Sequence, residues 1–303
     1  MARPVPRVDV RLHAAALKAR GITGLELFDA LADFELSLKL TVLRDTRCHR
    51  CWHDKTSRCI CLHWDKVKIS RNARVLVLMH HREYYSAGNT GKILLALLPT
   101  SASLYVYGRS GDWEDFVKDL ALCPRRTLVL WPGVGALTVD GFLATVGETR
   151  SEWAGRGGGA DRGGEFQPLR VVVLDGTYNQ AAHMLKAMRK RLPPSLMPPA
   201  VALHPTTVSV FHRARKSYGA ASASEATKAL RVCTVEAFAL LLEELGEGAA
   251  VVEALVAAVV VNNRALASSL LVRPAGGMPA SATSGAARRR RRRAEEKAAE
   301  DHQ

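Results

Sequence analysis

Three short apolar runs, each followed by polar or turn-forming residues, are the feature that most constrains the fold of this chain. They span residues 73–79, 127–131 and 169–174, and their aliphatic and β-branched residues are typical of strands buried on both faces of a sheet. Helical patterns lie between them, at 90–98 and 180–191. Because strands that alternate with helices usually pair in parallel, the sequence predicts an α/β fold with a mostly parallel sheet and helices on both faces.

The residues after the predicted strands are candidates for a functional site. The first strand is followed by His80 to Glu83, the second ends at Trp131 to Gly133, and the third is followed by Asp175 to Tyr178. In open parallel sheets, ligands bind beyond the carboxyl ends of the strands. We therefore expect the chemistry of the protein at these three segments.

Four of the six cysteines lie between residues 48 and 61. Cys48 and Cys51 form a C-x2-C pair, and Cys59 and Cys61 form a C-x-C pair. Two close thiolate pairs can supply the four ligands of a tetrahedral zinc site, and a site with four protein ligands is structural. An iron–sulfur cluster and unmetallated thiols are the alternatives. Three nearby histidines could each replace one sulfur: His49, His53 and His63.

The charge of the chain indicates a partner that carries phosphate. The chain has 43 Lys and Arg against 29 Asp and Glu, a net charge of +14, and it stays basic without the run Arg288 to Arg293. An acidic membrane surface is the second interpretation and solubility alone the third, and charge by itself does not decide among them. The apolar stretch 249–261 is interrupted by Glu253 and is too short to cross a bilayer, so no membrane partner is expected.

The distribution of cysteines favours an intracellular protein. Cys123 and Cys233 stand apart from the cluster, which is unlike a disulfide framework, so we expect a reducing compartment. The nucleus and the cytoplasm both fit, because the arginine run permits nuclear import, and an organelle stays open.

Composition divides the chain into four predicted parts. Residues 1–43 form a helical segment, with a helical pattern over 12–43, and the cysteine cluster occupies 44–70. The α/β domain covers 71–273, and its glycine-rich stretch 154–164 is interpreted as a flexible loop insertion. An arginine-rich tail follows at 274–303, and its composition is typical of disorder.

The order and spacing of these motifs resemble the DTW-domain family, which comprises tRNA-uridine aminocarboxypropyltransferases related to the knotted SPOUT methyltransferases. The resemblance covers about residues 44–272. Besides the cysteine cluster it rests on four groups of motifs: 81–83 with 89–92, 130–133, 174–181 and 233–237.

The resemblance implies transfer of the 3-amino-3-carboxypropyl group of S-adenosylmethionine to N3 of a tRNA uridine, with release of methylthioadenosine. Asp175 corresponds to the family's essential carboxylate, and N3 is a weak acid that needs a base. The residues expected to hold the donor are Trp131, Pro132, Gly133, Asp175, Thr177, Tyr178, Thr234 and Glu236. Those expected to contact the tRNA are Arg82, Asn89, Thr90, Arg189, Arg213 and Arg215.

Three departures from the family pattern leave other functions open as alternatives. Tyr178 replaces the name-giving tryptophan, Cys233 replaces a serine, and His81 stands where a His-Pro pair is usual. Tyrosine keeps an aromatic face for stacking. The alternatives are a non-catalytic, zinc-containing RNA-binding protein with a decayed pocket, and a SPOUT-type RNA methyltransferase.

Some of the motifs also have a purely structural interpretation. Asp175 could cap the helix that follows it, as could Asn89 and Thr90 at an earlier helix start. The Thr234-x-Glu236 pattern is likewise a helix-start signal. Whether these side chains serve the fold or the site depends on contacts that a local pattern does not reveal.

Overall fold

The computed structural model describes residues 10–69, 73–155, 167–203 and 232–271. The predicted tail 274–303, residues Arg213 and Arg215, and most of the predicted loop 154–164 lie outside the described residues. The chain divides into two units, Met1–Leu266 and Ala267–Gln303. Of the second unit, only 267–271 are described, as the end of a helix.

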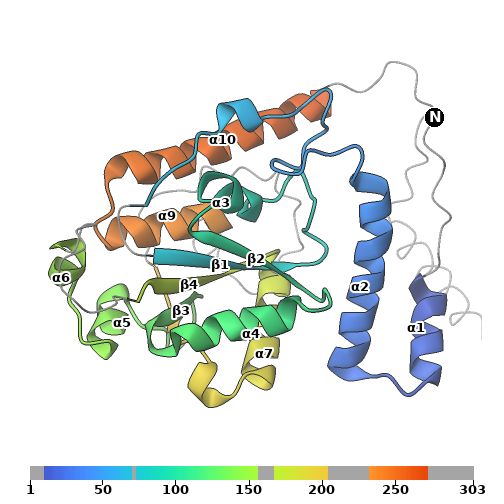
Figure 1. Cartoon of the computed structure of the whole chain (residues 1–303), viewed down its shortest axis with the longest axis horizontal. Coiled ribbons are helices and arrows are strands. Elements are labelled where there is room, and N and C mark those ends of the chain that lie inside the picture. Colours follow the sequence, from blue (N-terminus) through green and yellow to red (C-terminus); the bar gives the residue numbers. More distant parts are fainter. Residues whose placement is uncertain (1–9, 70–72, 156–166, 204–231, 272–303) are drawn as a thin grey trace, which may run out of the picture. The chain divides into compact units, whose positions relative to one another are not determined.

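A sheet of five parallel strands forms the centre of the domain (Figure 1). This confirms the predicted α/β class, and three of the strands coincide with the three apolar runs. The other two were not predicted: one has only two residues, and the other begins with half-buried residues that include Ser103. The strands are β1 (Ala73–His80), β2 (Ala102–Tyr107), β3 (Thr127–Leu130), β4 (Leu169–Asp175) and β5 (Ala200–Val201), in the order β2-β1-β4-β3-β5.

Helices cover both faces of the sheet, as predicted (Figure 1). Successive side chains of a strand point to opposite faces. In the described residues the helices are α1 (Val10–Ala19), α2 (Gly24–Leu43), α3 (Gly91–Leu97), α4 (Asp112–Leu122), α5 (Val139–Thr145), α6 (Arg150–Gly155), α7 (Tyr178–Arg191), α9 (Thr234–Glu244) and α10 (Ala249–Leu271), with short 3₁₀ turns at Cys61–His63, Pro124–Arg126 and Pro194–Leu196. On β1, Val75 and Val77 therefore pack with α3, α5, α9 and α10, while Leu76 and Leu78 pack with α4 and α7.

The N-terminal helical segment is two helices rather than the continuous pattern expected over 12–43. Gly21 follows α1 with a φ of +82°, a left-handed conformation that ends helices and that glycine adopts without steric cost. The second helix, α2, then packs closely against the end of β2. At Gly108, which has a φ of +94°, an added Cβ would lie 2.3 Å from the Cβ of Ala32.

Helix α10 is longer than the apolar stretch 249–261, so the expectation that this segment is too short to cross a bilayer is wrong. Residues Ala249–Ala267 are long and apolar enough, by length and composition, to cross a membrane. One face of the helix nevertheless belongs to the core, where Leu255 and Val259 are buried and Asn262 Oδ1 accepts a hydrogen bond from His53 Nε2 at 3.0 Å. Core helices often meet the same criteria, so α10 does not indicate a membrane protein.

Candidate functional site

Asp175 lies at the carboxyl end of a central strand and is held from two sides. It is the last residue of β4, and only 2% of it is exposed. The side-chain amide of Asn89 donates to Oδ2, and the hydroxyl of Thr234 donates to Oδ1 at 2.7 Å. Asn89 precedes α3 and Thr234 opens α9, so two distant segments fix the orientation of the carboxylate.

The helix after β4 is not capped by Asp175. Its cap is Thr177, whose hydroxyl accepts from the backbone N–H of Gln180 at 3.4 Å. The Gln180 side chain in turn accepts from the Thr177 N–H at 2.7 Å, which completes a capping box. The interpretation of Asp175 as a helix cap is therefore wrong, and the local role of Thr177 is to start α7.

The start of α3 lies against the carboxylate of Asp175. A Cβ on Gly91 would be 2.6 Å from Cγ and 2.7 Å from Oδ1 of Asp175, so only glycine permits this approach. Asn89 also caps the helix, because its Oδ1 accepts from the Lys92 N–H at 2.9 Å. Thr90 is buried and makes no side-chain capping bond. Asn89 thus serves both the fold and the site, whereas the role of Gly91 was not predicted.

Lys92 lies in the motif 89–92 but was not predicted as a site residue, and it is completely buried beside this cluster. Its Nζ donates to the carbonyl oxygen of Ala87 and lies 6.0 Å from the centre of the Trp52 ring. Burial lowers the pKa of Lys92 to about 7, against the attraction of Cys51 and Asp175. A lysine next to a helix-start motif looks solvent-exposed in sequence, and only the fold shows that it is enclosed.

Two aromatic rings stack at the ends of neighbouring strands. Trp131 follows β3 and Tyr178 opens α7 after β4, and β3 pairs with β4. The ring centres are 5.0 Å apart with an interplanar angle of 24°. Tyr178 is 46% exposed, and Pro132 and Gly133, which follow Trp131 in the chain, are exposed as well. The tyrosine therefore provides an accessible aromatic surface at this edge of the sheet.

The start of α9 contains both a cap and a site contact. The Glu236 carboxylate accepts from the backbone N–H of Cys233 at 2.7 Å, so Glu236 serves as part of the cap of α9. The neighbouring Thr234 uses its hydroxyl for Asp175 instead. Burial raises the pKa of the Cys233 thiol, which is therefore protonated at neutral pH. A contact between Glu236 and a donor molecule stays a prediction.

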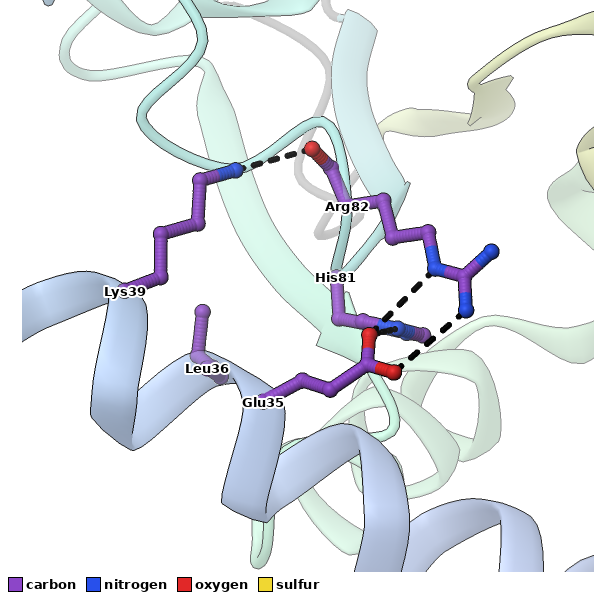
Figure 2. A pocket seen from close by; sticks show the side chains of 5 residues that line it. All are labelled: Glu35, Leu36, Lys39, His81 and Arg82. Carbon is purple, nitrogen blue, oxygen red and sulfur yellow. Dashed lines mark hydrogen bonds and ion pairs between the residues drawn. The ribbon is translucent and has the colours of Figure 1, made fainter. Parts of the chain in front are cut away.

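Arg82, expected to bind RNA, is paired with α2 (Figure 2). Glu35 Oε2 lies 3.3 Å from Arg82 Nε and 3.2 Å from His81 Nε2, and Lys39 donates to the Arg82 carbonyl oxygen at 2.8 Å. With Leu36 these side chains line a cavity of about 120 Å³. The Arg82 side chain is 63% exposed despite the ion pair, so a phosphate could still reach it.

Arg189 is not near the Asp175 cluster. It is exposed in the last turn of α7, eleven residues after Tyr178, which corresponds to about 16 Å along the helix axis. Arg189 could therefore contact only a part of an RNA that lies away from the reacting base. Its predicted partners Arg213 and Arg215 lie outside the described residues.

His80, at the end of β1, is buried in its neutral form. Burial, with the neighbouring charges of His81, Arg82 and His183, lowers the pKa of His80 to about 3. Its Nδ1 accepts from the Arg82 N–H at 3.3 Å, which requires a ring protonated on Nε2 alone. In the unfolded chain this histidine binds a proton near pH 6.5. The stability that the folded chain has with a neutral His80 is therefore complete above pH 6.5. It is lost as the pH falls from 6.5 towards 3, because protonation then favours the unfolded chain.

We expect the free energy of unfolding to fall more steeply with acid in the wild type than in His80→Gln. Between pH 7 and pH 5 the additional loss in the wild type should be about 2 kcal/mol. Urea denaturation of both proteins at each pH measures it, and the comparison removes contributions that the two proteins share. Parallel pH profiles would show that His80 does not titrate in this way.

The four clustered cysteines have the geometry of a metal site. Their Sγ atoms all lie within 4.8 Å of one another, with Cys48 and Cys61 at 3.4 Å and Cys51 and Cys59 at 3.8 Å. Zinc–sulfur bonds of about 2.3 Å in a tetrahedron place sulfurs about 3.8 Å apart. Burial alone would raise the pKa of Cys48, but backbone hydrogen bonds from Cys51 and Arg50 lower it to about 7. The thiols therefore fit a metal such as zinc.

Two of the three nearby histidines have other partners. His49 Nδ1 forms a hydrogen bond of 2.6 Å with the Tyr85 hydroxyl, and His53 bonds to Asn262. His63 lines a separate cavity beside α10, together with Trp64. This arrangement favours four sulfur ligands over a set in which a histidine replaces one.

A fixed carboxylate lies at the carboxyl ends of the strands of this parallel α/β domain, which is where open parallel sheets bind their ligands. The DTW domain model matches residues 45–262, and the chain belongs to the DTW-domain family, as the motifs predicted. This family indicates an enzyme that modifies tRNA. A comparison with curated proteins finds no match, and neither does a comparison with solved structures.

Proposed function

We propose that the protein transfers the 3-amino-3-carboxypropyl group of S-adenosylmethionine to N3 of a tRNA uridine. The observation that supports this most is the Asp175 carboxylate, buried at the end of β4 and held by Asn89 and Thr234, in a chain of the DTW-domain family. A buried carboxylate that two donors hold in one orientation, and that does not cap the helix after it, is suited to a reacting group.

The chemistry requires one base and good alignment. Asp175 takes the N3 proton of the uracil, and the N3 electron pair forms a bond to the aminocarboxypropyl carbon. The bond from that carbon to sulfur breaks, and its electrons neutralise the sulfonium, so methylthioadenosine leaves as a neutral thioether. No general acid is needed for this leaving group, and most of the rate comes from placing N3 in line with the carbon–sulfur bond.

The donor binds beside Trp131 and Tyr178, at the carboxyl ends of β3 and β4. The Trp131–Tyr178 pair offers an accessible ring surface for the adenine, and the exposed backbone of Pro132 and Gly133 lies beside it in the chain. At the four cysteines, zinc would be fully coordinated by protein, so it would stabilise residues 48–61 and take no part in the reaction. We propose that the protein works in the nucleus or the cytoplasm, with an organelle as the alternative.

Incubation of the protein with unmodified tRNA and S-adenosylmethionine tests the function. Mass spectrometry of the nucleosides should show an aminocarboxypropyl uridine. A methylated nucleoside would indicate a methyltransferase instead. Absence of any product, together with no thermal stabilisation by S-adenosylmethionine, would indicate a decayed pocket, because a ligand that binds only the folded state must raise its stability.

We expect tRNA affinity to depend steeply on salt. A protein that neutralises several phosphates releases their counterions, and the basic chain supplies such contacts. The dissociation constant should rise by about tenfold or more between 50 and 200 mM salt. Fluorescence anisotropy with labelled tRNA measures this, and donor binding without tRNA provides the control. A flat response would mean that base contacts determine affinity.

A further inference from the structure

Lys92 is a buried lysine that the proposed reaction does not use. It is the second residue of α3, and its side chain has no exposed surface. Moving an amine out of water costs free energy unless other groups satisfy it, and here Nζ donates to the carbonyl oxygen of Ala87. A methionine would fill the same volume without that cost. The hydrogen bond to Ala87 is therefore the feature that a polar residue supplies at this position.

Lys92 holds the segment before α3 at two points. Its Nζ donates to the carbonyl oxygen of Ala87. Its backbone N–H donates to the side chain of Asn89, which follows Ala87 by two residues. The second bond fixes Asn89 Oδ1, so that Nδ2 of the same amide is directed to Asp175. A short segment held in this way cannot rotate the amide away from the carboxylate without breaking a buried hydrogen bond.

Beside Lys92, the side chain of Trp52 is held in place by contacts with Tyr85 and Arg47. The Trp52 ring stacks on Tyr85, with ring centres 5.6 Å apart and an interplanar angle of 10°. Arg47 Nη1 donates to the backbone oxygens of both residues, at 3.1 and 3.0 Å. Trp52 and Tyr85 each have a φ of 57°, a conformation that residues other than glycine keep only where contacts impose it. The surroundings therefore limit how far Nζ can move from Ala87.

We propose that Lys92 is a positioning residue for Asp175: it anchors Ala87 to Asn89 so that the Asn89 amide keeps the carboxylate in one orientation. This inference rests on the proposed function. Without the Nζ donor, the segment gains freedom, and Asp175 spends less time in the orientation that meets the N3 proton. Asn89 and Thr90, which were expected to contact the tRNA, are buried, so binding must rely on more exposed groups, and the affinities for the donor and for tRNA should change little.

The test compares Lys92→Met with the wild type in two independent measurements. Hydrogen exchange followed by mass spectrometry should show amides in residues 84–91 exchanging about tenfold faster. The kcat for transfer should fall by about tenfold to a hundredfold, because small misplacements of a reacting group are costly. We expect the melting temperature and metal content to be kept, and both KM values to stay within about threefold.

Matched variants separate positioning from general packing. Ile93→Val, at a fully buried neighbour on α3, should lower stability but leave kcat and the exchange of 84–91 unchanged. Lys92→Gln keeps a shorter donor and should recover part of both losses, so it also serves if Lys92→Met does not fold. Exchange and kcat should change together across these variants.

Several outcomes would overturn the inference. Lys92→Met with wild-type exchange would show that Lys92 does not hold the segment, and loss of metal would assign it to the cysteine cluster. Faster exchange with unchanged kcat would show that the segment does not position Asp175. If the wild type transfers no group at all, the proposed function fails, while the exchange experiment still decides whether Lys92 anchors the segment.

Discussion

Asp175→Asn should fold, bind S-adenosylmethionine and bind tRNA, yet lose turnover by about a hundredfold to ten-thousandfold, as removal of a general base typically does. The substitution leaves the local hydrogen bonds satisfiable. The asparagine oxygen can accept from Asn89, and its NH₂ can donate to the Thr234 hydroxyl, which reverses its direction. A single-turnover assay at saturating donor and tRNA, with a thermal melt alongside, measures both effects.

Asp119→Asn is the matched control for this experiment. Asp119 is a carboxylate on α4, and it accepts hydrogen bonds from Arg170 and Tyr105, away from the carboxyl ends of the strands. Removal of its charge should lower stability, because the buried Arg170 loses its ionic partner, while single turnover stays near the wild-type rate. Near-normal turnover in Asp175→Asn would assign Asp175 to the architecture, and the base would have to be another group.

Cys51→Ser should lose the bound metal and a large part of the stability of the chain. Cys51 is completely buried, and the segment around it has few elements of regular structure. A structural zinc contributes its binding free energy to folding. A loss of several kcal/mol corresponds to a fall of about 10 °C or more in the melting temperature. Metal analysis should give one zinc per wild-type chain and much less in the variant.

Cys233→Ser provides the matched control for the metal experiment. It makes the same chemical change at a cysteine outside the cluster, at the N-terminal cap of α9, where serine is favourable. This variant should keep its metal and its melting temperature. Full metal content and normal melting in Cys51→Ser would exclude the four-thiol assignment.

The core strands were predictable from sequence because β1, β3 and β4 are buried on both faces, which leaves uninterrupted apolar runs. Strand β2 was missed because its first three residues are only half buried. The position of Asp175 followed from the rule that sites lie after strands. Its partners did not, since Asn89 and Thr234 are 86 and 59 residues away and locally look like helix starts.

Other features of the site depend on approaches between segments that no local pattern encodes. Gly91 is required by the Asp175 carboxylate, and Lys92 by a carbonyl that only the fold brings into reach. The pairing of Arg82 with Glu35 of α2 was unpredictable for the same reason. In sequence, Glu35 looks like one of the many charges on an exposed helix face that have no specific partner.

The close approach of Ala32 and Gly108 has a consequence for how this protein can diverge. A larger residue at either position would force α2 away from the end of β2, and Glu35, one turn after Ala32, would be displaced from His81 and Arg82. Substitutions at the two positions should therefore be inherited together rather than singly. Ala32 precedes the matched DTW region, and Gly108 lies inside it. Selection that acts on the DTW domain therefore also constrains α2, which lies outside residues 45–262.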